Sequence, residues 1–414
     1  MTTMAIDNKD KKVLKSSIER EQNEVACSAE CEKIKGSKNL NVPPLRFPEF
    51  TEEWKAEQLD NIATLSKGIG ISKEQLSEDG EPCILYGELY TKYKSEIIKH
   101  VESKTDIDSS KLKRSKANDV IIPCSGETAV DIATARCVPF DNILLGGDLN
   151  VISLHKYDGA FMSYQLNGKR KYDIARVAQG VSVVHLYGEH LKAIKTYNPS
   201  LPEQQKIAEL LSLIDERIAT QNKIIEDLKK LKSAISERLL KGVKGSTVLL
   251  SDICDIVKGK QINGENLSES GNYYVMNGGT ELSGYYDDYN VEANTISISE
   301  GGNSCGYVQF NTSPFWSGGH CYSIQDITDN VDNLYLYHYL KSKEDAIMKL
   351  RIGSGLPNIQ KKDLAMFKIK IPAVEQQLKI SIFLSSLERK AEIEERIQNA
   401  LLKEKQYLLH QMFI

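Results

Sequence analysis

Residues 198–218 have the sequence NPSLPEQQKIAELLSLIDERI, and residues 371–390 have the related sequence IPAVEQQLKISIFLSSLERK. The two stretches align without a gap at one constant offset, which pairs Pro199 with Pro372 and Ser212 with Ser385. The Glu-Gln-Gln triplets are an exception, because they are shifted by one position in this alignment. A repeat over so long a distance predicts two copies of one structural unit in the chain.

Both stretches begin long segments in which apolar side chains are spaced alternately by four and three residues, as in a coiled-coil seam. Polar residues such as Gln221 and Lys232 interrupt the first seam. The predicted seam positions are Leu211, Ile214, Ile218, Ile225, Leu228, Ile235 and Leu239 in the first segment and include Leu384, Leu387 and Leu401 in the second. A helix of about 40 residues is about 60 Å long, so we expect two long helices that pair antiparallel.

Glycines outside the helical segments repeat as well. Lys67-Gly68 aligns with Lys258-Gly259, and at the same offset Gly87 aligns with Gly278. Further along the chain, a second offset aligns Ser125-Gly126 with Glu300-Gly301, Arg176 with Arg351 and Gly180 with Gly355. Shared glycines mark shared turns, and the short β-branched runs between them are typical of strands. Each copy is therefore expected to consist of a strand-rich part followed by a long helix.

These patterns predict an α+β fold with a pseudo-twofold internal repeat. Two similar mixed α/β domains are separated by two long antiparallel helices that form a coiled coil. The predicted boundaries are an N-terminal extension and lead-in at 1–53, a first α/β domain at 54–198, a helical segment at 199–246, a second α/β domain at 247–371 and a second helical segment at 372–414.

The composition is that of a globular protein, with 414 residues, 41% of them hydrophobic. No stretch has the roughly 18 consecutive apolar residues of a membrane helix, and the first residues lack the apolar core of a signal peptide, so we expect a cytoplasmic protein. The eight cysteines include no CxxC pair, and only Cys27 and Cys31 are close in sequence. We expect reduced thiols and no metal site.

Charge is distributed unevenly between the two predicted α/β domains. Residues 54–198 contain 19 Lys and Arg against 19 Asp and Glu, whereas residues 247–371 contain 10 against 15. The formal net charge of the chain is −4. Because phosphate neutralisation dominates nonspecific DNA affinity, we expect the chain alone to bind nucleic acid weakly.

The two quoted stretches resemble the helical regions that type I restriction-modification specificity subunits have in common. LRFPEFTEEW, residues 45–54, is similar to the run that leads into this family's first target-recognition domain. The resemblance covers roughly residues 41–414. It implies that the α/β domains at 54–198 and 247–371 are target-recognition domains and that the helical segments are spacers.

The resemblance further implies a non-catalytic subunit that recognises a bipartite sequence in double-stranded DNA, one half-site per domain. Its partners would be modification subunits, two copies of a methyltransferase, and an ATP-dependent nuclease subunit. Residues 41–44, Asn-Val-Pro-Pro, are not an amino-methyltransferase motif, and the sequence contains no GxxxxGK[ST] phosphate loop. We therefore expect no catalytic residues and no cofactor. Glu203, Gln204 and Lys206 are predicted to face outward and contact the partners.

Base recognition requires side chains with donors and acceptors on loops. Our candidates near the shared glycine turns are Lys67, Tyr86, Ser125, Glu127, Arg136 and Asn150 in the first domain and Lys258, Lys260, Asn277, Asn303, His320 and Tyr322 in the second. For each of these residues alone, stabilisation of a turn is the alternative role.

Phosphate contacts are predicted for basic clusters and for the arginines aligned between the copies. These residues are Lys111, Lys113, Arg114, Lys116, Lys169, Arg170, Lys171, Arg176 and Arg351. A solvated charge run is the alternative for the clusters.

Two other functional interpretations remain. One is a non-catalytic coiled-coil adaptor that binds proteins through its two lobes, which the acidic second domain favours slightly. The other is an enzyme with an unrecognised site, although the sequence lacks paired carboxylates or a Ser/His arrangement at usable spacing. His320 and Cys321 with Cys305 lack a fourth ligand at familiar spacing, so they do not predict a metal site.

Overall fold

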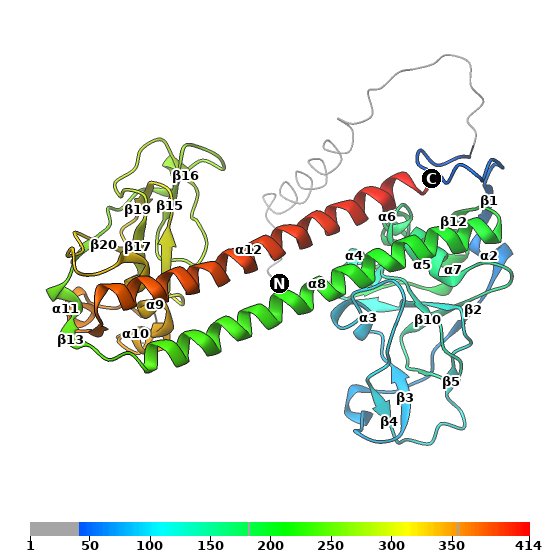
Figure 1. Cartoon of the computed structure of the whole chain (residues 1–414). Coiled ribbons are helices and arrows are strands. Elements are labelled where there is room, and N and C mark those ends of the chain that lie inside the picture. Colours follow the sequence, from blue (N-terminus) through cyan, green and yellow to red (C-terminus); the bar gives the residue numbers. More distant parts are fainter. Residues whose placement is uncertain (1–40, 181–182, 354, 356) are drawn as a thin grey trace, which may run out of the picture. The chain divides into compact units, whose positions relative to one another are not determined.

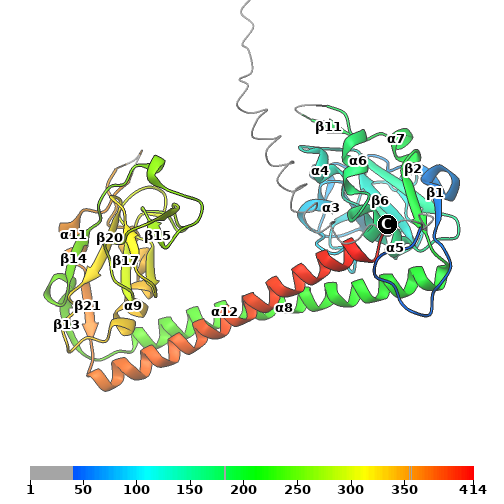
Figure 2. The ribbon, with the colours of Figure 1, turned by 90° about the horizontal axis from the view of Figure 1, so that it is seen from above.

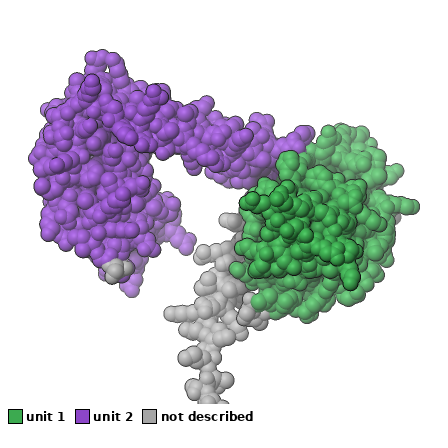
Figure 3. Space-filling view, turned by 90° about the horizontal axis from the view of Figure 1, so that it is seen from below, with its two compact units in different colours: residues 1–212, 407–414 green, residues 213–406 purple. Residues whose placement is uncertain are grey.

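The structure is a computed structural model that describes residues 41–414 except 181–182, 354 and 356. Residues 1–40 of the predicted N-terminal extension and lead-in, with Cys27 and Cys31, lie outside the described residues. The chain forms two compact units, shown in different colours in Figure 3. Of the described residues, 41–212 and 407–414 form unit 1, and 213–406 form unit 2.

Unit 1 is built on a four-stranded antiparallel sheet in the order β2-β10-β6-β8. These strands are β2 (Ala63–Lys67), β6 (Asp119–Pro123), β8 (Arg136–Val138) and β10 (Leu149–Leu154). A second sheet has the order β4-β3-β9-β5, with β3 (Glu81–Ile84), β4 (Lys104–Thr105), β5 (Lys113–Arg114) and β9 (Leu144–Leu145). Two strand pairs complete the unit, β1 (Lys55–Gln58) with β12 (Lys195–Asn198) and β7 (Ser125–Gly126) with β11 (Val184–His185).

Unit 1 also contains short helices (Figure 1). They are α2 (Leu59–Ile62), η1 (Lys73–Gln75), α3 (Glu88–Thr91), α4 (Ala129–Ile132), α5 (Gly159–Asn167), α6 (Lys171–Val177) and α7 (Gly188–Lys192). The central strand β6 is buried on both faces. Val120 and Ile122 pack into the cluster beneath α5 and α6, whereas Ile121 packs with Ile84 and Leu145 of the second sheet. This burial explains the continuous apolar run of β6.

Unit 2 repeats this topology. Its four-stranded sheet has the order β14-β20-β17-β18, with β14 (Asp255–Lys258), β17 (Thr295–Ser299), β18 (Val308–Asn311) and β20 (Cys321–Gln325). The smaller sheet contains β15 (Tyr273–Met276), β16 (Tyr285–Tyr286) and β19 (Phe315–Ser317), and β13 (Ser246–Leu249) pairs with β21 (Lys368–Ile371). The short helices are η2 (Leu250–Asp252), η3 (Gly264–Asn266), α9 (Asn333–Ser342), α10 (Glu344–Met348) and α11 (Lys361–Ala365).

Strand pairing confirms the predicted duplication. In unit 1, β1 pairs with β12 through Lys55 and Asn198, and in unit 2, β13 pairs with β21 through Ser246 and Ile371. The sequence alignment matches the same residues, because the glycine offset places Lys55 on Ser246 and the helical offset places Asn198 on Ile371. The parallel pair of β3 and β9 likewise has its counterpart in β15 and β19. The two units therefore share one fold.

Between these matched ends, the predicted alignment was wrong by one or two positions. The Leu186 N–H donates to Cys124 O at 2.8 Å, and the Ile359 N–H donates to Glu300 O at 2.8 Å. Glu300 therefore corresponds to Cys124, and not to Ser125 as expected. In the smaller sheets, the Gly146 N–H donates to Ile84 O and the Gly318 N–H to Met276 O. Matching Ile84 to Met276 pairs Gly87 with Gly279 rather than Gly278.

The loop after α6 shows the largest correction. Gln179 and His185 form an isolated bridge in unit 1, and Ile352 and Asn358 form its counterpart in unit 2. This register pairs Gly180 with Gly353, and not with Gly355. Both glycines have a positive φ, +126° and +103°, which most residues avoid. Arg176 and Arg351 are consequently not equivalent positions.

The two long helices are α8 (Leu201–Lys241) and α12 (Val374–Gln411), which lie side by side in Figures 1 and 2. Within unit 2 they are antiparallel, because Asp215 pairs with Lys405 at 2.6 Å and Lys232 pairs with Glu388. Among the described residues, no helix is long and apolar enough to cross a membrane.

The predicted seam is confirmed over most of its length. Leu211, Ile225, Leu384 and Leu401 are buried, and the other predicted positions except Leu239 are half-buried. Polar seam residues pair with each other, since the Gln221 amide donates to the Glu394 carboxylate at 2.7 Å. Leu239 is exposed, and Leu240 is instead buried in the core of unit 2. An α-helix has 3.6 residues per turn, so a seam of strict 3.5 spacing drifts around it.

A buried glutamine ties the start of each long helix to its own unit. In unit 1, Gln204 Oε1 accepts from the Asp158 N–H at 2.9 Å, and its Nε2 donates to Pro199 O at 2.8 Å. In unit 2, Gln377 makes the corresponding bonds to Asp332 and Pro372 at 2.8 and 2.9 Å. The gap-free alignment therefore holds, and the shifted triplets conceal this equivalence.

The expectation that Glu203 and Gln204 face outward was wrong. Both residues are buried, each 1% exposed. Glu203 accepts from Arg46 at 2.7 and 2.8 Å and from the indole of Trp54 at 3.2 Å, which fixes the lead-in against the helix. Lys206 is exposed, as predicted, and pairs with Glu49.

His338 of α9 makes the stability of unit 2 depend on pH. Its imidazole is buried beside α12, 2.9 Å from Ser385 Oγ, and burial lowers the pKa to about 4. The unfolded chain binds a proton near pH 6.5, so between pH 6.5 and 4 it binds more protons than the folded chain. We expect acidification across this range to remove up to about 3 kcal/mol of stability.

Hydrogen exchange of α9 amides between pH 7 and 4, corrected for intrinsic rates, measures this loss. His338→Gln should flatten the profile, whereas the matched change at exposed His100 should leave it unaltered. Parallel profiles for the wild type and His338→Gln would contradict the assignment.

Candidate nucleic-acid interface

The last residues of β2 and β14 occupy equivalent places. In the antiparallel strand register, Lys67 of β2 lies opposite Asn150 of β10, and Lys258 of β14 lies opposite Tyr322 of β20. The glycine that follows each lysine lies close to the backbone of another glycine, Gly146 in unit 1 and Gly318 in unit 2. A Cβ on Gly68 would lie 1.9 Å from Gly146 O, and one on Gly259 would lie 2.2 Å from Gly318 O. Only glycine fits, so both units keep the same close contact, which we call the strand-end crossing.

In unit 1 the strand-end crossing borders a pocket of about 820 Å³. The pocket lies between residues 70–76 and residues 85–88, with Thr91, Lys92, Gly147 and Asp148 also in its lining. Tyr86, a predicted base contact, lies in this lining. Asp148 is exposed beside the crossing and has a positive φ of 58°. A concave surface with a few polar groups is the usual form of a binding site.

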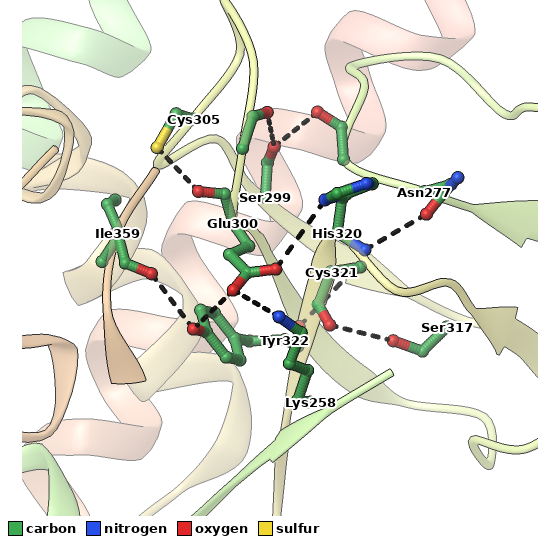
Figure 4. A network of polar contacts seen from close by, with 12 residues as sticks. Lys258, Asn277, Ser299, Glu300, Cys305, Ser317, His320, Cys321, Tyr322 and Ile359 are labelled. Carbon is green, nitrogen blue, oxygen red and sulfur yellow. Dashed lines mark hydrogen bonds and ion pairs between the residues drawn. The ribbon is translucent and has the colours of Figure 1, made fainter. Parts of the chain in front are cut away.

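In unit 2 the equivalent place holds a polar network (Figure 4). Glu300 Oε1 accepts from Lys258 Nζ at 2.7 Å and from the Tyr322 hydroxyl at 3.1 Å. His320 Nδ1 lies 3.9 Å from Glu300 Oε2, and the backbone N–H of His320 donates to Asn277 Oδ1 at 3.2 Å. Four of the predicted DNA contacts thus belong to one cluster around a glutamate that is 8% exposed.

The corrected register shows which residues replace this network in unit 1. Cys124 stands in the place of Glu300 and Asp148 in that of His320, because the Cys124 N–H donates to Asp148 O as the Glu300 N–H does to His320 O. Burial raises the pKa of the Cys124 thiol to about 11, so the group is neutral at pH 7. In unit 2 the buried carboxylate of Glu300 lies below the exposed imidazole of His320. In unit 1 the neutral thiol of Cys124 lies below the exposed carboxylate of Asp148.

Several predicted DNA contacts are wrong, because their side chains are buried or held inside the fold. Arg136 is 8% exposed and donates to the carbonyl oxygens of Leu89, Ala135 and Tyr93. The Asn150 amide donates to Leu186 O. Ser125 is buried in β7, and the Tyr322 hydroxyl lies 3.1 Å from Glu300 Oε1 and 3.0 Å from Ile359 O, which share its single proton.

In the predicted phosphate clusters, Lys111 and Lys116 are exposed, whereas Arg114 and Arg170 are half-buried and engaged in contacts within unit 1. Arg114 forms a two-pronged contact with Glu81, at 2.7 and 3.1 Å. Arg170 pairs with Asp173, donates to Ile414 O and stacks over the Tyr197 ring. Burial lowers the pKa of Lys171.

The remaining candidates stay accessible. Lys113 lies half-buried in a small groove with Lys116 and His155. Lys67, Lys260, Asn303, Arg176 and Arg351 are exposed, and Arg176 forms an ion pair with Asp173 at 3.4 Å. Lys67 and Lys260 flank the strand-end crossings, whereas the arginines lie near the α6 and α10 loops.

Sequence reasoning missed Asp148 and assigned no role to Glu300. A signal was present, because Gly146-Gly147-Asp148 in the first copy aligns with Gly318-Gly319-His320 in the second. A paired glycine followed by a different polar residue in each copy marks a shared turn with different exposed chemistry.

A family model of the type I restriction modification DNA specificity domain matches residues 51–230 and 243–403. The chain belongs to this family. Among specificity-subunit relatives, a putative type I specificity subunit of Mycoplasma pneumoniae is 31% identical over 145 residues, 34% of this chain and 38% of its own length. A similar protein of Mycoplasma genitalium is 32% identical over 29% of this chain and 31% of its own length. The matched part thus spans about a third of these two relatives.

Other comparisons extend over almost the whole chain. A putative type I restriction enzyme specificity subunit of Methanocaldococcus jannaschii is 23% identical over 415 aligned residues, 90% of this chain and 96% of the relative. The crystal structure of the S subunit of a type I restriction-modification system from M. genitalium has a TM-score of 0.66 at 20% identity, covering 90% of this chain and 99% of that one. This likeness confirms the specificity-subunit fold, with two α/β domains and two long helices.

Arg136 should stabilise the specificity-subunit fold rather than contact DNA. Arg136→Met removes a donor from three carbonyl oxygens, and although Ala135 O still accepts from the Asn167 amide, we expect a cost of about 2 kcal/mol or more in the free energy of unfolding of unit 1. Arg176→Met, at a side chain that is 72% exposed, should change stability by less than about 0.5 kcal/mol. Urea denaturation compares the variants, and equal stability would contradict the structural role of Arg136.

Proposed function

We propose that the chain is the DNA-recognising subunit of a type I restriction-modification complex, and that each α/β domain recognises one half of a bipartite target. One observation carries the proposal: the same strand-end crossing occurs in both units, with Asp148 above Cys124 in one and His320 above Glu300 in the other. A shared backbone with different exposed groups fits two readers of different short sequences. Family membership supports DNA recognition as the task of both domains.

The accessible candidates divide into two kinds of DNA contact. Lys67, Tyr86 and Asp148 in unit 1, and Lys258, Lys260, Asn277, Asn303 and His320 in unit 2, are proposed to lie against base edges. Lys113, Arg176 and Arg351 are proposed to contact phosphates, which position the protein without specifying sequence. The paired helices are proposed to set the gap between the half-sites.

We further propose that the long helices dock the partner subunits. The outward face of α12 in unit 2 carries apolar side chains, including Ile382, which is 69% exposed, and Ile393. Such residues on a helix that already has a buried seam mark a surface for another protein. The partners would be two modification subunits and an ATP-dependent nuclease, which supply the catalysis in the cytoplasm.

The charge balance fits a reader that depends on these partners. Unit 2 has fewer basic than acidic residues in its α/β domain, so it gains little from phosphate neutralisation. Tight binding would then require basic surfaces on the partner subunits. This makes the free chain a weak DNA binder and the assembled complex a strong one.

A protein-binding adaptor is the second candidate function, and one observation favours it. The smaller sheet of unit 2 carries half-exposed aromatic side chains, with the Tyr286 and Trp316 rings 5.1 Å apart, beside the acidic residues Asp287 and Asp288. Aromatic residues are enriched at protein interfaces. The adaptor would direct no DNA methylation, which separates the two functions experimentally.

Co-expression of the chain with its modification subunit should produce adenine methylation at one bipartite motif with a constant gap. Sequencing that detects N6-methyladenine in the host DNA measures this directly. The modification subunit expressed alone is the control and should leave the motif unmethylated. Absence of any bipartite motif from the complex would favour the adaptor.

Exchange of residues 54–198 for those of a related specificity subunit should change one half of the methylated motif and leave the other half unchanged. The physical reason is that unit 1 has its own buried clusters and does not rely on unit 2 for its core. The reciprocal exchange of residues 247–371 should change only the other half. Simultaneous change of both halves by either exchange would refute the assignment of one half-site to each domain.

A further inference from the structure

Glu300 has one satisfied and one unsatisfied oxygen. Oε1 accepts from Lys258 Nζ at 2.7 Å and from the Tyr322 hydroxyl at 3.1 Å. Oε2 is buried and has no hydrogen-bond partner within the described part of the chain. The imidazole of His320 lies next to it, with Nδ1 at 3.9 Å (Figure 4). A buried carboxylate oxygen is costly to leave unpaired, so Oε2 is poised to accept a hydrogen bond from His320 Nδ1.

The backbone around His320 holds the residue in place while leaving its ring accessible. Its N–H donates to Asn277 Oδ1, and a Cβ on Gly278 would lie 2.9 Å from His320 Cβ. A Cβ on Gly301 would lie 3.7 Å from His320 Nδ1. The side chain is nevertheless 62% exposed. With Nδ1 directed to Glu300, the Nε2 edge is the part of the ring available to a ligand.

We propose that Glu300 is a positioning residue that fixes the tautomer of His320, so that Nε2 accepts a hydrogen bond from the exocyclic amino group of one adenine or cytosine in the half-site recognised by unit 2. The inference rests on the proposed function. The hydrogen bond made by one ring nitrogen determines which nitrogen carries the proton in neutral imidazole. A proton held on Nδ1 by the carboxylate leaves a lone pair on Nε2. Adenine N6 and cytosine N4 are the amino donors of the major groove.

Unit 1 also presents a hydrogen-bond acceptor at this place, but the acceptor is a carboxylate instead of an imidazole. Asp148 occupies the place of His320, and a carboxylate accepts through either oxygen without any choice of tautomer. The residue beneath it is accordingly the neutral thiol of Cys124 and not an acid. Glu300 is thus needed only where the exposed acceptor is an imidazole.

Glu300→Gln tests the inference, because the structure dictates how the amide orients. The Lys258 ammonium contacts the Oε1 position and can only donate, so the amide oxygen occupies this position and the NH2 group faces His320. Nδ1 must then accept, the proton moves to Nε2, and the ring becomes a donor. Guanine O6 occupies the place of adenine N6, and thymine O4 that of cytosine N4. We expect one position of one half-site to change by a transition, from adenine to guanine or from cytosine to thymine.

The full complex of the chain with its modification subunits is used, and the methylated motif is determined by sequencing. His320→Ala should relax the same position, with discrimination among bases lowered about tenfold or more. Glu281→Gln, at an exposed glutamate of the same unit, should leave the motif unchanged. The half-site assigned to unit 1 serves as the internal control in every variant.

The outcomes distinguish a failure of this inference from a failure of the proposed function. The inference is supported if Glu300→Gln changes one position of the motif by a transition. If the Glu300→Gln complex fails to assemble, the inference is supported by His320→Ala, provided that this variant relaxes one position. A wild-type motif that both variants retain at every position overturns it. The role of Glu300 is also overturned if His320→Ala relaxes the base preference at one position while a well-assembled Glu300→Gln complex keeps the original base there. A wild-type complex that methylates no bipartite motif overturns the proposed function, and this inference with it.

Discussion

The buried amides of Gln204 and Gln377 fix how each long helix leaves its α/β unit. A primary amide that is removed from water needs partners for both its oxygen and its NH2 group, and each unpaired group would cost about 1–3 kcal/mol. Both glutamines meet this need with the N–H of a helix-capping aspartate and the carbonyl of a proline just before the helix. The direction of the helix relative to its unit is therefore set by hydrogen bonds, and the apolar seam needs only to pair the helices.

The sequence predicted the features that depend on local spacing. The seam positions Leu211 and Leu384 are buried, and the duplication appears in strand pairs that join the residues matched by the repeats. The register in between was not predictable in the same way, because short loops differ in length and glycines occur often enough to align by chance. Both Gly353 and Gly355 were available as the counterpart of Gly180, and the positive φ that Gly180 shares with Gly353 supports Gly353.

The candidate site was predicted less well, for a physical reason. Arginine and asparagine serve equally to contact DNA and to satisfy buried carbonyl groups, and only the tertiary fold decides between these roles. The Arg136 guanidinium is buried against the carbonyl oxygens of Leu89, Ala135 and Tyr93, whereas Arg176 extends into solvent. Glu300 was overlooked because an isolated acid has no periodic signature. Its importance comes from Lys258, Tyr322 and His320, which are distant from it in sequence and meet it only in the folded unit.

Unit 1 contains both early and late parts of the chain. Trp54, Phe161, Leu211 and Phe413 pack in one buried cluster, so side chains that lie hundreds of residues apart in the sequence share one core. During synthesis, this cluster stays incomplete until the ribosome has translated the whole of unit 2. The apolar side chains of this cluster therefore lack their late partners, Met412 and Phe413, until that part of the chain has been made.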